Sequence, residues 1–373
     1  MTLKFKHLLP FIFIALSIGC KKKNTQLDKV SAIISNELDV LISKKEIDGA
    51  SIGIYLRGKT YEFHRGALTN GMNNPPKKET LYEIASLTKT FSGVLLAQAV
   101  TEGKVKLDDD VRMYLKGNFP NLEYQGKPIT FLHLVTHRSG LPLIFPNKPE
   151  LFDNPNQEKL PFVISKLQAG FTKNDYFEEL LKVKLDTIPG SKFGYSNPGA
   201  NLLGYCLENI YNMSFEQILK AKILSPLKMD NTRITLTESN KKKLAQGYND
   251  NNIKMPFEPE SPMKAAGGIL SNVGDMLKYI RFHLHEDNDV IKVSHKELLG
   301  LWNDFDNGLF WQILIHKNKP NTIFQNGGAF GTSSWLTLIP EKQIGVFIVT
   351  NKKGNKTHKY LNSTVESLIE KLQ

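Results

Sequence analysis

The stretch Leu81-Tyr82-Glu83-Ile84-Ala85-Ser86-Leu87-Thr88-Lys89-Thr90-Phe91 joins a strand-like run to a helix. Residues Leu81-Ile84 have the character of a short strand, and apolar side chains recur at helical spacing from Phe91 to Ala99. We therefore expect Ser86 where the helix begins, with Lys89 one turn later on the same face. The helix N-terminus adds unpaired N–H groups and a partial positive charge beside the Ser86 hydroxyl. This arrangement can activate a serine for acyl transfer without a histidine.

The serine-to-lysine spacing is not specific by itself, because it recurs at Ser225, Ser239 and Ser261. A proline directly follows the serine at 225 and at 261, and the copy at 239 lies in a polar, loop-like stretch. Ser86 is the copy that follows a strand and opens a helix. We therefore expect catalysis at Ser86.

Two further constellations carry chemistry. The first is Phe193-Gly194-Tyr195-Ser196-Asn197-Pro198, a loop before a helix. A tyrosine is a poor base at neutral pH, but beside the Lys89 ammonium its phenolate form is favoured and could take the proton of Ser86. The second is Gln325-Asn326-Gly327-Gly328, which we expect to end a strand over 321–324. Its glycines allow close approach to a substrate, and an amide N–H there could join that of Ser86 in holding an oxyanion.

Two motifs are rejected. The spacing of Gly53 to Thr60 fits a phosphate-binding loop, but alternating apolar residues predict a β-hairpin over 50–67 with its turn at 57–60. The run 49–53 imitates a nucleophile elbow around Ser51, but a strand follows it where that motif needs a helix. Tyr360-Leu361-Asn362 repeats the tyrosine-x-asparagine spacing inside the C-terminal helix, where we expect a structural role.

Composition narrows the classes further. With 373 residues and 40% hydrophobic content, the chain can bury a large core, which we expect to divide in two. The formal charge of +11 is spread along the sequence and suits an anionic wall or membrane partner. We expect no nucleic acid as a partner, because no basic stripe is interleaved with aromatic residues. We expect no nucleotide either, because the phosphate-binding-loop spacing falls in the predicted hairpin.

No metal and no cofactor are expected. Cysteine and histidine residues show no zinc-like spacing, and His283 and His285 would point in different directions on a helix. Cys206 lies in a helical-looking apolar stretch and is interpreted as a small buried hydrophobic residue.

The N-terminus has the features of a targeting segment. A basic start at Lys4 and Lys6 precedes an apolar stretch, Leu8 to Ile18, that is too short to span a bilayer comfortably. Leu16-Ser17-Ile18-Gly19-Cys20 resembles a bacterial lipoprotein processing box, although Ser17 replaces the usual leucine. We interpret residues 1–19 as a signal peptide, Cys20 as the lipidated residue and 20–30 as a tether. An ordinary secretion signal is the alternative, and either one predicts an extracytoplasmic protein.

The order of elements predicts two domains. Strands are expected near both ends of the chain, over 308–315, 321–324, 332–339 and 345–350 besides the hairpin. Helices are expected over 27–42, around Met276 to His283 and at the C-terminus, and the middle is mainly helical and loop-like. We predict a sheet domain of residues 31–85 plus 265–373, an inserted helical domain of 86–264, and the catalytic cleft between them.

Taken in order, the three constellations resemble those of the serine β-lactamase and penicillin-binding-protein-like superfamily. The likeness is closest to class C β-lactamases and CubicO-type serine hydrolases, and it extends to residues 107–110, 136–142 and 266–271. The resemblance implies an α/β (α+β) fold, a mostly antiparallel sheet flanked by N- and C-terminal helices. The inserted helical domain belongs to the same fold.

The resemblance also implies roles for the residues. Ser86 would be the nucleophile that forms an acyl-enzyme, with Lys89 and Tyr195 sharing the general-base role. Asn197 would orient Lys89 and the amide of the substrate. The N–H groups of Ser86 and Gly328 would form the oxyanion hole, within the substrate-binding run Gln325, Asn326, Gly327 and Gly328. The resemblance gives His137 no catalytic role, and a structural hydrogen bond is expected there.

One position departs from the family pattern. True β-lactamases and transpeptidases begin the strand motif with a lysine that binds the substrate carboxylate, whereas this chain has Gln325. A charge-assisted hydrogen bond is roughly twice as strong as a neutral one, so β-lactam recognition should be weakened. Lys352 and Lys353 are candidates to supply the missing charge.

We therefore expect an envelope-anchored serine hydrolase that acts on an ester, an amide or a D-amino-acid peptide, including small or peptidoglycan-derived substrates. One alternative is a class C-like β-lactamase or D-Ala-D-Ala carboxypeptidase. An alternative of another class is a non-catalytic module of the same fold that binds cell-wall peptide. The presence of Ser86, Lys89 and Tyr195 together argues against that module.

Overall fold

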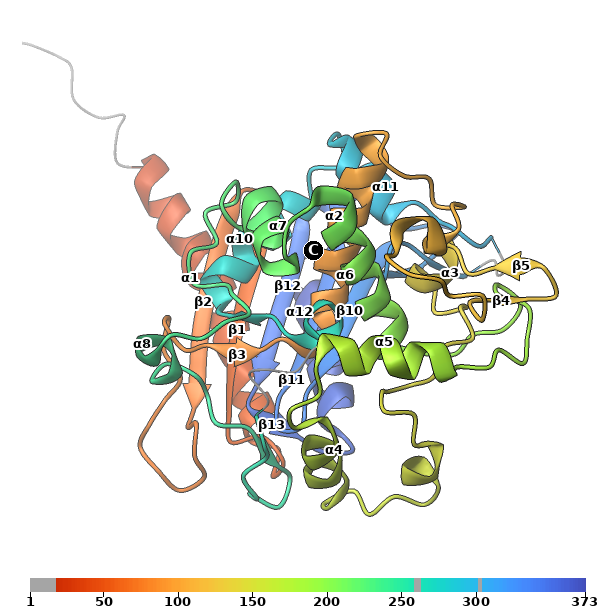
Figure 1. The fold of residues 1–373 in the computed structure, drawn as a ribbon. Coiled ribbons are helices and arrows are strands. Elements are labelled where there is room, and N and C mark those ends of the chain that lie inside the picture. The colour runs from red at the N-terminus through yellow and green to blue at the C-terminus, as the bar shows by residue number, and fades with distance from the viewer. Residues whose placement is uncertain (1–17, 258–262, 301–303) are drawn as a thin grey trace, which may run out of the picture.

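A seven-stranded antiparallel sheet crosses the molecule (Figure 1). The computed structural model describes residues 18–257, 263–300 and 304–373, and side chains from Lys29 onward. The strand order is β2-β1-β12-β11-β10-β9-β8. In chain order the strands are β1 (Gly49–Leu56), β2 (Lys59–Gly66), β8 (Phe305–Asn307), β9 (Gln312–Leu314), β10 (Thr322–Gly328), β11 (Ser333–Ile339) and β12 (Ile344–Thr350).

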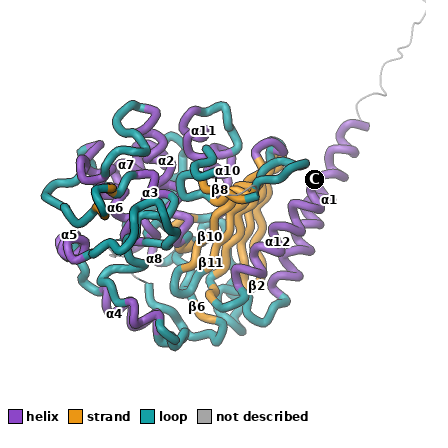
Figure 2. The backbone as a smooth tube through the Cα atoms, turned by 90° about the vertical axis from the view of Figure 1, so that its right-hand side faces the viewer, coloured by secondary structure: helices purple, strands orange, loops and turns teal. Residues whose placement is uncertain are grey.

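The two faces of the sheet carry different helices (Figure 2). Helices α1 (Ile18–Ile42) and α12 (Thr357–Leu372) cover one face, where apolar side chains of β1 and β12 form a separate core with them. Helices α2 (Thr88–Thr101), α10 (Val273–His283) and α11 (Asp289–His295) lie on the other face. There the core continues without a break into the helical middle of the chain. The hydrophobic core is therefore divided in two, as predicted, with one part on each face of the sheet. The predicted domain boundaries at 85/86 and 264/265 stay a prediction.

The helical middle is built from short elements. Its helices are α3 (Phe131–Val135), α4 (Leu160–Gln168), α5 (Lys173–Lys182), α6 (Asn197–Tyr211), α7 (Phe215–Leu219), α8 (Glu238–Lys241) and α9 (Lys264–Gly267). Two-residue strands pair outside the main sheet: β3 (Tyr82–Glu83) with β7 (Leu270–Ser271), β4 (Glu123–Tyr124) with β5 (Lys127–Pro128), and β6 (Tyr248–Asn249) with β13 (Lys352–Lys353).

The hairpin that we predicted over 50–67 is confirmed as β1 and β2. Its turn residues Arg57 and Gly58 both have positive φ, 46° and 86°, as a tight two-residue turn that follows the twist of the strands requires. Helix α10 packs so closely on β1 that a Cβ at Gly53 would clash with Val273 and Leu277. The glycine that imitates a phosphate-binding loop is thus needed for packing a helix on the sheet.

The prediction of a strand over 308–315 is wrong in its first half. Residues 309–311 instead form a buried loop between β8 and β9. Their backbone groups bind other segments, since Leu309 N–H donates to Ser294 O (2.9 Å) and Phe310 N–H donates to Val135 O (3.3 Å). The apolar side chains are buried as expected, but this core contact breaks the strand into a hairpin. Strand β10, by contrast, is longer than predicted and includes 325–328.

The N-terminal predictions lie mostly outside the described residues. The predicted signal peptide falls there apart from its last residues, which begin α1, and the side chain of Cys20 is outside the described set. No helix in the part of the chain that the structure describes is both long enough and apolar enough to cross a membrane.

Candidate active site

Ser86 lies in a clamped turn between β3 and α2. The turn is a short 3-10 helix, Ala85–Leu87, that Ala85 enters with a left-handed φ of 50°. The hydroxyls of Thr332 and Ser334 donate to the carbonyl oxygens of Glu83 and Ile84, each at 3.0 Å. These bonds tie the nucleophile turn to β11 and the loop before it. The strained backbone at Ala85 persists because the surrounding sheet holds it in place.

Lys89 is fully buried and its ammonium group has three partners. Its Nζ donates to Ser86 Oγ (3.2 Å), Asn197 Oδ1 (2.8 Å) and the carbonyl oxygen of Ala266 (2.7 Å). Three acceptors match the three N–H bonds of a charged lysine. None of these acceptors is a carboxylate, so the positive charge stays available to a neighbouring negative group.

Tyr195 completes the arrangement. Its Oη lies 2.7 Å from Ser86 Oγ, and Lys89 Nζ lies 4.8 Å from the centroid of its ring. The tyrosine directly precedes α6, whose N-cap Ser196 accepts a hydrogen bond from Gly199 N–H. The same helix start places Asn197 against Lys89. The structure thus brings together Ser86, Lys89, Tyr195 and Asn197, as the sequence predicted.

His137 supports Tyr195 from behind. The two rings are 4.3 Å apart, and Ser196 N–H donates to His137 Nδ1 (3.3 Å). Burial, and to a smaller extent the Lys89 charge, lowers the pKa of His137 to about 3. A neutral imidazole that accepts a backbone hydrogen bond has the structural role expected from the sequence.

Strand β10 passes directly against the nucleophile turn. A Cβ at Gly327 would overlap Ile84 O and lie 2.6 Å from Ser334 Oγ, so this close contact requires glycine. Gly328, one residue further, lines the same cleft as Ser86. The two backbone N–H groups predicted to hold an oxyanion therefore belong to adjacent walls of one cleft.

Gln325 is bound by the protein itself. Its Nε2 donates to Phe310 O (2.5 Å), and its Oε1 accepts from Asn326 N–H (2.9 Å) and Gln312 Nε2 (3.3 Å). Only 8% of the residue is exposed. Its amide is therefore a poor replacement for a lysine that binds a substrate carboxylate.

Of the two lysines that could supply the missing charge, Lys352 is occupied. It forms an ion pair with Asp48 (2.7 Å) and also donates to Asn252. Lys353 lies differently, because its Nζ would be 2.7 Å from a Cβ placed on Gly328. Burial lowers its pKa. Lys353 is thus the cation that lies beside the predicted oxyanion strand.

Two hollows lie beside Ser86 and Tyr195. The first, which we call the Ser86 cleft, has a volume of about 370 Å³ and is lined by Ser86, Asn197, Gly328, Glu83, residues 266–268 and apolar side chains from 143 to 164. The second, which we call the Phe193 hollow, has a volume of about 480 Å³ and is lined by Tyr195, Phe193, Arg138, Phe310, Gln325 and Asn326. Tyr195 lines the second hollow, and Ser86 lines the first.

Glu83 is a residue of the cleft that sequence reasoning missed. Burial raises the pKa of its carboxyl group to about 7. Its position could have indicated this, because Glu83 lies three residues before Ser86 on a short strand. Side chains alternate along a strand, so Glu83 points to the side opposite to Tyr82.

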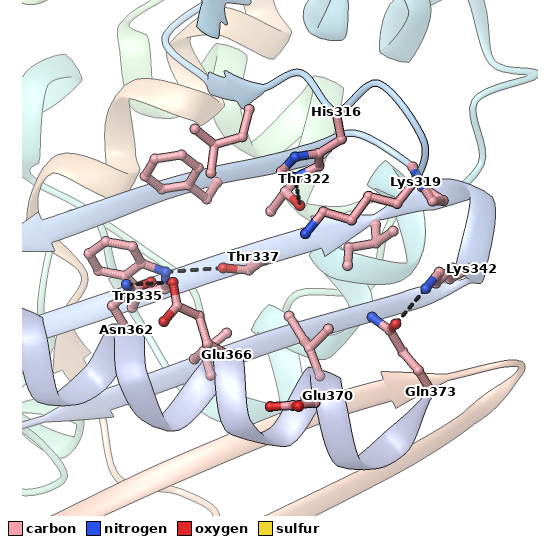
Figure 3. A pocket seen from close by; sticks show the side chains of 16 residues that line it. His316, Lys319, Thr322, Trp335, Thr337, Lys342, Asn362, Glu366, Glu370 and Gln373 are labelled. Carbon is pink, nitrogen blue, oxygen red and sulfur yellow. Dashed lines mark hydrogen bonds between the residues drawn. The ribbon is translucent and has the colours of Figure 1, made fainter. Parts of the chain in front are cut away.

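A further hollow lies on the other side of the sheet. It has a volume of about 530 Å³ and is formed by β9, β10, β11 and α12 (Figure 3). Asn362 of the second tyrosine-x-asparagine pair lies here and donates to Glu366 (3.0 Å). It belongs to α12, which covers the sheet face opposite to α2 (Figure 2). No residue of the predicted site lines this hollow.

The cysteine and the possible metal ligands are placed as follows. Within the described ranges, no three His, Cys, Asp or Glu side chains are grouped so that they could hold a metal ion. Cys206 is buried in α6, and burial raises the pKa of its thiol.

The chain is similar to known proteins over most of its length. The family model described as Beta-lactamase matches residues 30–368. The chain is 24% identical over 363 residues to a protein named Beta-lactamase from Escherichia coli (strain K12), covering 87% of this chain and 89% of that protein. It is 26% identical over 326 residues to D-alanyl-D-alanine-carboxypeptidase/endopeptidase AmpH of the same strain, covering 82% and 80%. Protein flp from Staphylococcus aureus (strain N315) is 25% identical over 353 residues, covering 92% and 66%.

Proposed function

This chain belongs to the Beta-lactamase family, and on that premise we propose that Ser86 is its acylated nucleophile. The chain is a serine hydrolase of that family. The observation that supports the assignment of Ser86 is its hydroxyl, 2.7 Å from Tyr195 Oη and 3.2 Å from Lys89 Nζ. A nucleophile within hydrogen-bond reach of a base that a third group orients is the pattern of nucleophilic catalysis.

The proposed reaction has two stages. Ser86 Oγ attacks the carbonyl carbon of an ester or amide while its proton passes to Tyr195 Oη, and the Lys89 ammonium stabilises the phenolate. The oxyanion would be held by the N–H groups of Ser86 and Gly328. Tyr195 then gives the proton to the leaving group, and the acyl-enzyme remains. A water molecule attacks the acyl carbon, releases the carboxylic acid and returns the proton to Ser86.

The substrates that we propose are esters, amides or D-amino-acid peptides of the cell envelope. Two observations support this range over β-lactams. Gln325 stands where the family pattern has lysine, and its amide is already bound by Phe310 O and Asn326 N–H. We also propose that Cys20 is lipidated and anchors the protein outside the cytoplasm, as the motif at 16–20 predicts.

The test is the intact mass of the mature protein after incubation with a fluorophosphonate and, separately, with a cephalosporin. We expect a fluorophosphonate adduct that Ser86→Ala abolishes. A lasting or brief cephalosporin adduct at Ser86 would move the protein toward the β-lactam-recognising enzymes. An adduct that persists in Ser86→Ala would contradict Ser86 as nucleophile.

A further inference from the structure

Glu83 presents a carboxyl group to the Ser86 cleft. The residue is on β3, where Tyr82 points into the core and its Oη lies 2.9 Å from the Ser51 hydroxyl. Because side chains alternate along a strand, Glu83 projects to the other side, and it lines the cleft together with Ser86 and Gly328. Its backbone carbonyl accepts the Thr332 hydroxyl bond (3.0 Å), so the position of this strand is fixed.

This carboxyl group has no cationic partner within the part of the chain that the structure describes. Lys89, the cation of the site, uses its three N–H bonds on Ser86, Asn197 and Ala266. Burial raises the pKa of the Glu83 carboxyl group to about 7. Glu83 is half-buried, and a carboxyl group in a cleft with a raised pKa and no protein cation beside it is a candidate contact for a cationic ligand.

The two hollows can be assigned to the two halves of a substrate. Tyr195 must reach the leaving group to protonate it, and Tyr195 lines the Phe193 hollow. The leaving group therefore occupies that hollow, and the acyl half that stays bonded to Ser86 occupies the Ser86 cleft. Apolar side chains line the same cleft, with Leu143, Ile144 and Phe330 among them.

We propose that Glu83 binds a protonated amino group carried by the acyl half of the substrate, so that the enzyme prefers aminoacyl esters and amides over uncharged ones. The inference rests on the proposed function and adds a substrate class to it. The apolar walls hold the carbon chain of the acyl group, and the carboxylate of Glu83 accepts hydrogen bonds from its ammonium group. A hydrogen bond between two charged groups is roughly twice as strong as one between neutral groups.

The test uses pairs of phenyl esters in which CH₃ replaces NH₃⁺. 3-Aminopropanoyl phenyl ester is compared with butanoyl phenyl ester, and 6-aminohexanoyl with heptanoyl, at pH 8, where both amino groups are protonated. For at least one of the two pairs, we expect kcat/KM of the full-length protein to be about tenfold or more higher for the amino ester than for the uncharged ester. A hydrogen bond to a charged group gives a difference of this size. In Glu83→Gln the ratio should fall to about one. The control Glu79→Gln removes the same charge from an exposed residue nearby and should keep the preference.

Each outcome decides the question. A ratio near one for both pairs in the unaltered protein overturns the proposal without any variant, as does a preference that survives in Glu83→Gln. If no ester is hydrolysed and the fluorophosphonate does not label Ser86, the proposed function itself fails. Hydrolysis of both esters without preference leaves the proposed function intact and rejects the role of Glu83 alone.

Discussion

Ser86 and Ser51 each lie in a network of hydrogen-bonded side chains, one beside a cleft and the other between two strands. Ser51 Oγ is 2.8 Å from His64 Nδ1, and His64 Nε2 is 3.1 Å from Glu62 Oε1. This is the serine-histidine-carboxylate order of a hydrolase triad. The Ser86 network has no histidine in hydrogen-bond contact with its serine and uses lysine and tyrosine instead.

Access and backbone donors separate the two networks. Ser51 is fully buried in β1 and paired across the sheet with His64, so a substrate carbonyl cannot approach it. Ser86 is half-buried, lines a cleft of about 370 Å³ and has Gly328 on the adjacent wall. A hydrogen-bonded network of suitable side chains is therefore not sufficient for an active site. The site also needs room for the substrate and N–H groups that bind its oxyanion.

The largest expected effect comes from replacing one of the two serines, Ser86 or Ser51, by alanine. Ser86→Ala should lower kcat/KM for ester hydrolysis by about a thousandfold or more, because the covalent route is lost. Ser51→Ala should keep the activity. Hydrolysis rates and fluorophosphonate labelling of both variants measure the difference. Activity lost equally in both variants would reject the distinction between the networks.

The two tyrosines that contact these serines give a matched pair. Tyr195 Oη is 2.7 Å from Ser86 Oγ, and Tyr82 Oη is 2.9 Å from Ser51 Oγ. Tyr195→Phe should lower kcat about a hundredfold or more, since the proton acceptor is lost. Tyr82→Phe should keep kcat and lower the free energy of unfolding by about 1 kcal/mol. A normal kcat in Tyr195→Phe would assign the proton transfer to Lys89.

The third prediction concerns His137, the histidine behind Tyr195. Its pKa is about 3 in the folded protein and 6.5 ordinarily, so below pH 6.5 the unfolded chain takes up a proton that the folded protein does not. Stability should therefore fall as pH drops from 6.5 toward 3, by up to about 1.4 kcal/mol per pH unit from this group. Urea unfolding at several pH values measures the slope.

His137→Phe keeps a ring against Tyr195 but cannot be protonated, so its stability should depend less on pH. His283 and His295, whose pKa values are also lowered by burial, remain in the variant. The difference between the two slopes therefore isolates His137. Equal slopes would contradict the prediction.

The smallest effect is expected at Ser334, whose hydroxyl holds the nucleophile turn through Ile84 O. Ser334→Ala should lower the free energy of unfolding by about 1 kcal/mol. It should also lower kcat several-fold, because the turn before Ser86 loses one of its ties. Thr350→Ala is the control: its hydroxyl makes a similar buried bond to Gly49 O (2.7 Å), near the Ser51 network. That variant should lose stability alone.

Local patterns in the sequence determined much of the molecule. Alternation predicted the β1–β2 hairpin, and helical spacing predicted α2, α10 and α12. The strand-to-helix change at 81–91 singled out Ser86 among four copies of its spacing, the loop at 193–198 indicated Tyr195, and the family resemblance added the role of Asn197. These features depend on neighbours in the chain, which a sequence displays directly.

Only the tertiary structure decided the rest. The contact of Leu309 with Ser294 divides a predicted strand, and Gln325 is bound by Phe310. Glu83 lines the cleft because the fold brings apolar residues from other segments around it. Lys353 lies beside Gly328, in the strand β13 that pairs with β6. Burial, access and unpaired charge are properties of segments that meet from distant parts of the chain. Their packing is what left one serine beside a cleft and enclosed the other in the sheet.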